Sequence, residues 1–229
     1  MAARRKVRSV SELLSVNIGV PHSSPATSVG VTGIDKRPVD GPVDVRAPGP
    51  RGSGLGGGLV GDRILDGRNH GGDDQAVYAY AREDLDEWGA LLGRELSGGV
   101  FGENLTTLGV EVTGALIGER WRVGPELLLE VSVPRIPCNT FAHWMSEQGW
   151  IKRFTQRAVP GAYLRVVEPG QIRAGDVVEV VERPDHDVTI GVTFRALTLE
   201  PELLPRLLSA DALPEEALAK ARRRVAAAR

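Results

Sequence analysis

Apolar residues in the first three quarters of the chain fall into short runs that Gly, Pro and Asp interrupt. Runs of this kind are typical of short β-strands joined by tight turns. Because many such runs follow one another with few helical segments between them, the pattern favours a mainly β fold, a closed or nearly closed barrel, over a parallel sheet with crossover helices. The predicted strands are residues 13–20, 43–47, 59–65, 121–123, 127–133, 162–167 and 177–181.

Two segments in this region have a helical pattern instead, and we expect them at the periphery of the barrel. Residues 81–93 have acidic residues in their first turns and end at Gly93, as a helix does. Aromatic residues spread over 139–156 predict one or two short helices around Gly149. The apolar face of the first helix is formed, at three- and four-residue spacing, by Leu85, Trp88, Leu91 and Leu92.

From residue 186 onward the pattern is helical and glycine is rare. Helices are predicted at 187–199, 202–208 and 214–224, the second kept short by Pro205. We therefore predict two domains, a barrel domain at residues 1–185 and a small three-helix extension at residues 186–229. The basic residues near the end of the last helix complement its dipole, so we expect them to be solvated and not to bind nucleic acid.

Composition and charge exclude several classes of protein. Apolar residues make up 41% of the chain and charged residues 25%, which is typical of a globular protein. The net charge of −2 argues against a nucleic-acid partner, and no apolar run is long enough to span a membrane. Residues 1–8 are basic, but the residues after them form no apolar core. We therefore expect a solvated chain end, no signal peptide and a cytoplasmic protein.

The chain has one cysteine, Cys138, so it can form neither an intramolecular disulfide nor a zinc site built on a cysteine pair. Pro134 and Pro137 precede it. Because proline lacks a backbone donor, we predict that a strand ends here and presents the thiol at the mouth of the barrel. Arg135 lowers the pKa of this thiol if the two lie close together. The alternative is that Cys138 is a small buried apolar residue.

A second candidate site lies at residues 66–73, where His70 and Asp73 flank Gly71 and Gly72. Two consecutive glycines permit positive φ angles and a close approach of the backbone to a ligand. The alternative is a turn in which Asp73 begins a helix that continues to residue 80.

Two further clusters contain polar or charged residues that are candidates for binding a ligand. Glu103 and Asn104 lie in a loop bounded by glycines, where they reach a polar ligand or simply form a turn. Lys36 and Arg37 are adjacent and suit a phosphate, or they are a surface charge pair. The glycine-rich residues 48–61 lack the Lys and Ser/Thr that end a phosphate-binding loop, so we expect a flexible loop there.

None of these segments is decisive alone, but their order is. The series is Thr-Gly-Ile at 32–34, Gly-Asp at 61–62, His-Gly-Gly at 70–72, Phe-Gly-Glu-Asn at 101–104, Pro-Arg-Ile-Pro-Cys at 134–138 and Gly-Ala-Tyr-Leu-Arg-Val at 161–166. It resembles the MOSC domain family, named for the C-terminal domain of molybdenum cofactor sulfurases, over residues 9–182. The helical tail resembles the extension of bacterial YiiM-type proteins. Gln75 departs from the family pattern, in which a basic residue is common.

The resemblance implies a MOSC-type β-barrel that binds molybdenum cofactor, with Cys138 as the metal ligand or as a carrier of sulfur. A thiolate is a soft ligand that suits a metal already held by sulfur. The other residues that the resemblance makes candidates have different roles. They are Gly71, Gly72, Asp73 and Arg135 for the cofactor, Lys36, Arg37 and Arg68 for its phosphate, Glu103 and Asn104 for the pterin or substrate, and His70 for proton relay.

The expected function is therefore a molybdenum-dependent oxidoreductase that reduces N–O bonds of small N-hydroxylated compounds. Its electrons come from a separate reductase, because one cysteine excludes a four-cysteine iron–sulfur cluster. The alternative is a protein that carries sulfur or cofactor on Cys138 without turnover, supplied by a sulfur donor. A chain of 229 residues has no room for a pyridoxal phosphate-dependent desulfurase, so that cofactor is not expected. We expect a monomer or a homodimer.

Overall fold

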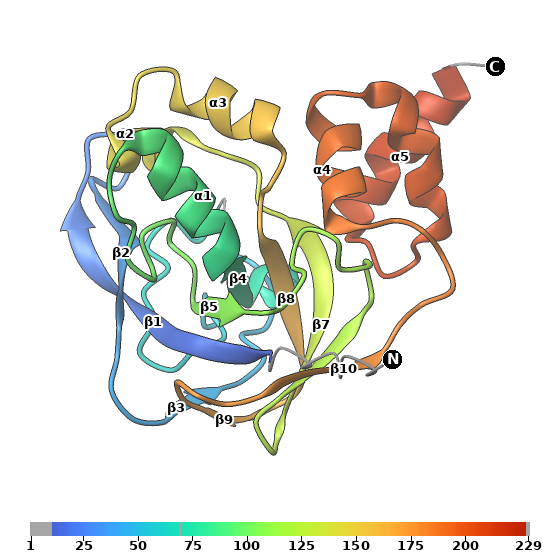
Figure 1. Cartoon of the computed structure of the whole chain (residues 1–229). Helices are drawn as coiled ribbons and strands as arrows, with labels where there is room; N and C mark the ends of the chain where they lie inside the picture. Colours follow the sequence, from blue (N-terminus) through green and yellow to red (C-terminus); the bar gives the residue numbers. More distant parts are fainter. Residues whose placement is uncertain (1–10, 69, 228–229) are drawn as a thin grey trace, which may run out of the picture.

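The structure is a computed structural model that describes residues 11–68 and 70–227. The basic residues 1–8, for which a solvated end is predicted, lie outside the described residues. Figure 1 shows strands β1 to β10 together with helices packed at one end and along one side. The strands are β1 (Glu12–Ser23), β2 (Val31–Pro38), β3 (Val43–Val45), β4 (Val77–Ala81), β5 (Leu105–Leu108), β6 (Arg120–Val123), β7 (Leu127–Pro134), β8 (Ala162–Glu168), β9 (Gly170–Ile172) and β10 (Val178–Glu182).

Eight strands form one mixed sheet in the order β10-β6-β7-β8-β4-β5-β1-β2, and β3 pairs with β9 in a separate two-stranded sheet. The two edge strands of the large sheet, β10 and β2, are not paired with each other, so the predicted closed barrel is not confirmed. The sheet curls because β1 pairs with β5 through its first half and with β2 through its second half, with a register shift in each pairing. A bridge between Glu12 and Val177 places the start of β1 beside the start of β10.

The strand predictions failed in two ways. Residues 59–65 are not a strand, since only Leu59 pairs, through an isolated bridge to Val45. Conversely, β2, β4, β5 and β9 were missed. All of β4 is buried, so it lacks the alternation by which a strand is recognised from sequence. It follows residues Asp73–Gln75, a single 3₁₀ turn labelled η1, and the alternative of a helix from Asp73 to residue 80 is therefore wrong.

The helices at the end of the sheet are α1 (Arg82–Leu92), α2 (Asn139–Met145) and α3 (Trp150–Arg157). The last two are separate helices, and Gly149 lies at the start of α3, as predicted. Leu85 and Trp88 of α1 are buried, whereas Leu91 is exposed, contrary to the prediction. An aromatic core joins the three helices to the loop before β5 through Trp88, Phe101, Phe141, Trp150 and Phe154. This core fixes the start of α2 and the cysteine that precedes it.

The C-terminal segment forms α4 (Ile190–Thr198), the 3₁₀ helix η2 (Pro201–Ser209) and α5 (Glu215–Ala227), which lie beside β7 in Figure 1. Helix α4 begins after Thr189, whose Oγ1 accepts a hydrogen bond from Val192 N, and not at Asp187 as predicted. Ile190 and Ala196 of α4 belong to the same buried cluster as the apolar residues of the sheet, and Phe194 belongs to the aromatic core. The division into domains after residue 185 stays a prediction. No helix in the described residues is long and apolar enough to cross a bilayer.

Candidate functional site

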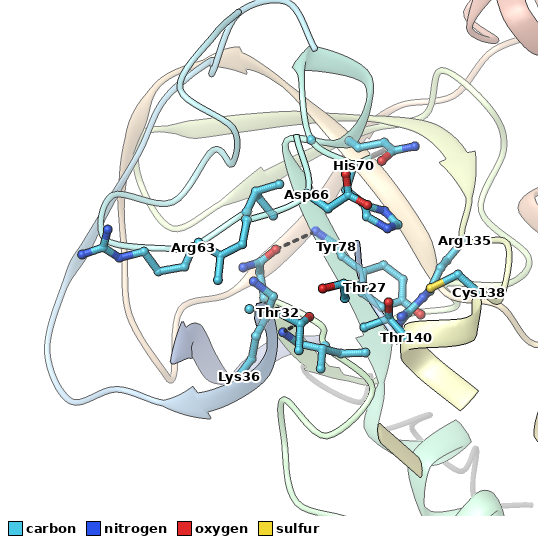
Figure 2. Close-up of a pocket in the computed structure, with 18 of the residues that line it drawn as sticks. Thr27, Thr32, Lys36, Arg63, Asp66, His70, Tyr78, Arg135, Cys138 and Thr140 are labelled. Carbon is cyan, nitrogen blue, oxygen red and sulfur yellow. Dashed lines mark hydrogen bonds between the residues drawn. The ribbon is translucent and has the colours of Figure 1, made fainter. Parts of the chain in front are cut away.

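Cys138 lies where the chain leaves β7 and enters α2. The strand ends at Pro134 and no regular structure follows until Asn139, as the two prolines predict. The Cys138 side chain is half-buried and lines a cavity of about 90 Å³ (Figure 2). The thiol is therefore accessible to a ligand and fixed at the end of the sheet.

The surroundings of Cys138 favour the thiolate. Burial by itself raises the pKa of the thiol, but the hydrogen bond with His70, the charge of Arg135 and the backbone N–H of Phe141 together lower it from 9.0 to about 6. A thiol with this pKa is mostly deprotonated at neutral pH, and the thiolate is the form that binds metals and acts as a nucleophile. The alternative of an inert buried cysteine does not fit this environment.

Arg135 carries a buried positive charge against aromatic rings. Its guanidinium lies 3.9 Å from the centre of the Phe141 ring and 5.2 Å from that of Tyr78, and it donates a hydrogen bond to the carbonyl oxygen of Phe101. Among the described residues, none of the ion pairs joins Arg135 to a carboxylate. A buried cation is stable only where something balances it, so the site favours an anion, either the Cys138 thiolate or a ligand.

The structure brings six of the predicted site residues together around this cavity: Lys36, His70, Gly71, Asn104, Arg135 and Cys138. They come from β2, from the 66–73 turn, from the loop before β5 and from the end of β7. Figure 2 shows His70, Arg135 and Cys138 on one side of the cavity and Lys36 on the other. The remaining predicted residues, Arg37, Arg68, Gly72, Asp73 and Glu103, do not line it.

The two basic residues of β2 point in opposite directions because side chains alternate along a strand. Arg37 is exposed and pairs with Asp35 on the outer face. Lys36 points inward, and its Nζ lies 2.5 Å from the carboxylate of the buried Asp62. Its charge is thus already balanced. Arg68 is exposed in a turn, so the three residues expected at a phosphate do not form one anion site.

Glu103 is a structural residue in this fold. It is fully buried, and its carboxylate accepts hydrogen bonds from Gly99 N, Phe101 N and Thr106 Oγ1. Asn104 accepts a hydrogen bond from Tyr78 N and donates one to Asp62, while also lining the cavity. Glu103 therefore shapes the loop that carries Asn104 instead of reaching a ligand itself.

The sequence predicts that the backbone at Gly71 and Gly72 approaches a ligand closely. In the structure it approaches another segment of the chain instead. A Cβ on Gly71 would lie 2.6 Å from the carbonyl oxygen of Gly56, and one on Gly72 would lie 2.7 Å from Arg51 N. Asp73 accepts a hydrogen bond from Gly49 N, and Gly72 N donates one to Gly56 O. The glycine-rich loop 48–61 is thus held against the 70–73 turn, in contrast to the flexible loop expected from its composition.

Sequence reasoning missed three residues that shape the site. Tyr78 and Tyr163 are directly opposite each other on β4 and β8, and both line the cavity. Nothing in the sequence indicates their pairing, which depends on strand register. Asp62 was noted as part of the Gly-Asp motif without a role. It accepts hydrogen bonds from Lys36, Asn104 and Gly19 N, which together hold its pKa below the usual range against the opposing effect of burial.

A second cavity, of about 400 Å³, adjoins the first on the side of the C-terminal helices. The two cavities share His70, Gln75 and Tyr163. Ligand sites in proteins have volumes of about 300–1,000 Å³. The smaller cavity, which Cys138 lines, is below this range, and the larger one falls within it.

Comparison with known proteins places this arrangement in a family. Residues 66–179 match the model of the MOSC domain. The chain is 31% identical over 207 residues to the uncharacterized protein YflK of Bacillus subtilis, covering 89% of each protein. The chain belongs to the MOSC domain family. The match includes the His70 turn and the Cys138 segment that line the cavity.

Two other relatives of this MOSC protein bear on its fold and function. The crystal structure of YiiM from Geobacillus stearothermophilus superposes with a TM-score of 0.74 at 27% identity, covering 94% of this chain and 99% of that one. A protein of Gibberella moniliformis named "Reductase" is 32% identical over 154 residues, which cover 66% of this chain and 26% of that protein. The C-terminal helices are thus part of a fold shared with YiiM.

The residues of the MOSC site fit molybdenum cofactor in their chemistry. The thiolate of Cys138 is a soft donor suited to the metal, and Arg135 is a buried cation that forms no ion pair with a carboxylate of the described residues. In the described residues no cluster of three His, Cys, Asp or Glu side chains can hold a metal. A metal of this cofactor would be held by the Cys138 thiolate at the wall of the cavity.

Proposed function

We propose that this protein is a molybdenum-cofactor-binding reductase of small N-hydroxylated compounds, with the metal bound by Cys138. The observation that carries the proposal is the Cys138 thiol, whose pKa is lowered to about 6 beside Arg135 and His70 at the wall of a cavity. The family supports the cofactor, and the relative named as a reductase supports the reaction type.

Each residue has a defined task in this proposal. Cys138 binds the metal as thiolate, and Arg135 balances the negative charge that accumulates there. Arg63 is exposed and lines the first cavity, whereas Arg37 and Arg68 do not line it. When bound, the cofactor supplies the two electrons that, with two protons, convert an N–OH group to N–H and water. His70 lines the cavity together with Cys138, so its imidazole is the group that passes a proton to the reacting centre. The electrons reach the site from a separate reductase protein.

The test uses protein expressed in a host that makes molybdenum cofactor. We expect about one molybdenum per chain in the wild type and a strong loss in Cys138→Ser, because a hydroxyl is a much poorer soft ligand. The wild type should reduce an N-hydroxylated purine with a chemical or protein electron donor. Metal-loaded protein that reduces no N-hydroxylated compound with several donors would contradict the proposal.

The low pKa of the half-exposed thiol also favours the alternative, a carrier of sulfur. In that case the thiolate attacks the outer sulfur of a desulfurase persulfide, and the desulfurase leaves as a thiolate. Intact mass would show one added sulfur on the wild type and none on Cys138→Ser. An unchanged mass would remove this alternative.

A further inference from the structure

An ion pair lies at the mouth of the larger cavity. The buried part of the cavity lining includes Pro134 of β7 and Ala217 of α5. The exposed part includes Arg51, from the glycine-rich loop 48–61, and Glu216 of α5. Arg51 Nη1 lies 3.7 Å from Glu216 Oε2. The pair therefore joins the loop to the C-terminal helices on the side of the cavity that faces solvent.

The backbone of Arg51 is held in place beside the cavity. A Cβ on Gly72 would lie 2.7 Å from Arg51 N, so the loop packs tightly on the 70–73 turn at this point. Two residues earlier, Gly49 N donates a hydrogen bond of 2.8 Å to the carboxylate of Asp73. Because the backbone is fixed here, the mouth opens or closes through rotation of the Arg51 side chain toward or away from Glu216.

The other polar contacts around the larger cavity do not cross its mouth. Asp74 of η1 pairs at 2.7 Å with Arg165 of β8, on the side of the sheet. Lys220 Nζ of α5 donates a hydrogen bond of 2.9 Å to the carbonyl oxygen of Leu197 in α4, on the side of the C-terminal helices. Each contact joins residues of one wall, so separating Arg51 from Glu216 leaves both walls intact.

The strength of the Arg51–Glu216 pair suits a contact that opens and closes. The side chain of Glu216 is 85% exposed and that of Arg51 is 37% exposed. Ion pairs between side chains this accessible to water contribute little to stability, and dissolved salt screens them. The closed arrangement is therefore favoured only severalfold over the open one, and ionic strength shifts the balance.

We propose that the Arg51–Glu216 ion pair controls entry to the larger cavity. While the pair is formed, the mouth hinders bulky molecules more than small ones, and when the pair breaks this difference decreases. The control is a property of the folded chain, because it requires neither a cofactor nor turnover. It therefore goes beyond the function proposed above and does not depend on it.

The test uses Cys138, the only cysteine, as a reporter of entry in the full chain. It lines the smaller cavity, which adjoins the larger one. The probes are N-ethylmaleimide, which is small, and N-(1-pyrenyl)maleimide, which has the same reactive group and a bulky ring system. The pyrene does not fit the smaller cavity of about 90 Å³, so it must occupy the larger one. The measured quantity is the ratio of the two alkylation rates at one pH, because a change in thiol reactivity affects both rates equally.

Breaking the pair should raise the rate of the pyrenyl probe relative to the ethyl probe. We expect about a threefold higher ratio in Arg51→Gln and in Glu216→Gln, as an exposed ion pair allows. The double variant should show no further rise, since either change already removes the interaction. An increase in sodium chloride from about 0.05 M to about 0.5 M should raise the ratio in the wild type and leave it unchanged in the variants. Glu215→Gln is the matched control, because the neighbouring Glu215 pairs with Arg222 at 2.6 Å and lines neither cavity.

Three outcomes overturn the inference: a ratio that does not rise in Arg51→Gln and Glu216→Gln, an equal rise in Glu215→Gln, or effects of the two changes that simply add. Additive effects would mean that each side chain acts alone and not as a pair. Failure of the proposed function looks different, because the alkylation ratios then change as expected in a protein that reduces no N-hydroxylated compound. If the protein reduces such a compound but the ratios do not change, the function stands and the inference fails.

Discussion

The imidazole of His70 and the thiol of Cys138 both line the smaller cavity and interact there, although the two residues come from a turn and a strand end that are far apart in the chain. Together with Arg135 and the backbone N–H of Phe141, His70 lowers the pKa of the Cys138 thiol against the opposing effect of burial. This contact also joins the two motifs that seemed most distinctive in the sequence into one site.

The first prediction concerns this contact. Because Cys138 is the only cysteine, alkylation by iodoacetamide reports its thiolate directly. Half-maximal reactivity should occur near pH 6 in the wild type. In His70→Ala it should shift upward by about one pH unit, since a group that stabilises the thiolate is lost while burial remains. His186→Ala serves as control, because His186 accepts a hydrogen bond from Val188 N just before α4 and lines neither cavity. An unchanged midpoint in His70→Ala would exclude the contact.

The second prediction concerns Gly71, which has a φ of +83°. Gly71→Ala should lower the free energy of unfolding by about 2 kcal/mol or more, because the new Cβ meets the Gly56 carbonyl and the backbone conformation disfavours a side chain. Urea denaturation measures the change. Gly67→Ala is the control, since a Cβ there meets nothing within 4 Å and we expect a change within about 0.5 kcal/mol. Equal effects of the two variants would show that loop 48–61 does not pack on the turn.

The third prediction concerns the buried pair of Lys36 and Asp62. Asp62→Asn should lower the free energy of unfolding by about 3–5 kcal/mol, because it leaves the Lys36 ammonium buried without a counter-charge. The pKa of Asp62 is lowered in the folded state, so its contribution is complete above the unfolded pKa and is lost as the pH falls through the folded pKa. The variant should therefore lose this part of the acid dependence. Asp187→Asn, in an exposed pair with Arg206, should change stability by less than about 1 kcal/mol at any pH.

The fourth prediction distinguishes a structural role of Glu103 from a role in cofactor binding. Glu103→Ala should lower the free energy of unfolding by about 3 kcal/mol, because it leaves buried donors of Gly99, Phe101 and Thr106 unsatisfied. The exposed Glu179→Ala should have little effect. A Glu103→Ala protein of normal stability that binds less molybdenum would instead assign Glu103 to the ligand.

Sequence reasoning succeeded where the physical signal is local. The prolines at 134 and 137 placed the end of β7 correctly, and the aromatic spacing placed α2 and α3 on either side of Gly149. It failed where a strand is buried on both faces, because the alternation of apolar and polar residues is then absent. The fully buried β4 has no alternation, and the charged residues of β2 are typical of a loop although two of them, Asp35 and Lys36, are buried.

The roles of the candidate residues could be assigned only from the tertiary structure. Lys36 and Arg37 are neighbours in sequence, yet strand alternation buries one against Asp62 and exposes the other. Gly71 and Gly72 permit a close approach, but only the fold shows that the approaching group is the glycine-rich loop. Only the fold shows that Gln75 lines two cavities and that its oxygen has no hydrogen-bond partner among the described residues.

The sequence by itself determined the family, a sheet-dominated fold with a helical tail, and the motifs that carry His70, Arg135 and Cys138. These are properties of residue order and of local conformational preference. The tertiary structure decided which side chains meet, how the sheet curls without its edge strands pairing, and which charges are already balanced. Those outcomes depend on strand register and on contacts between distant segments, so no local pattern contains them.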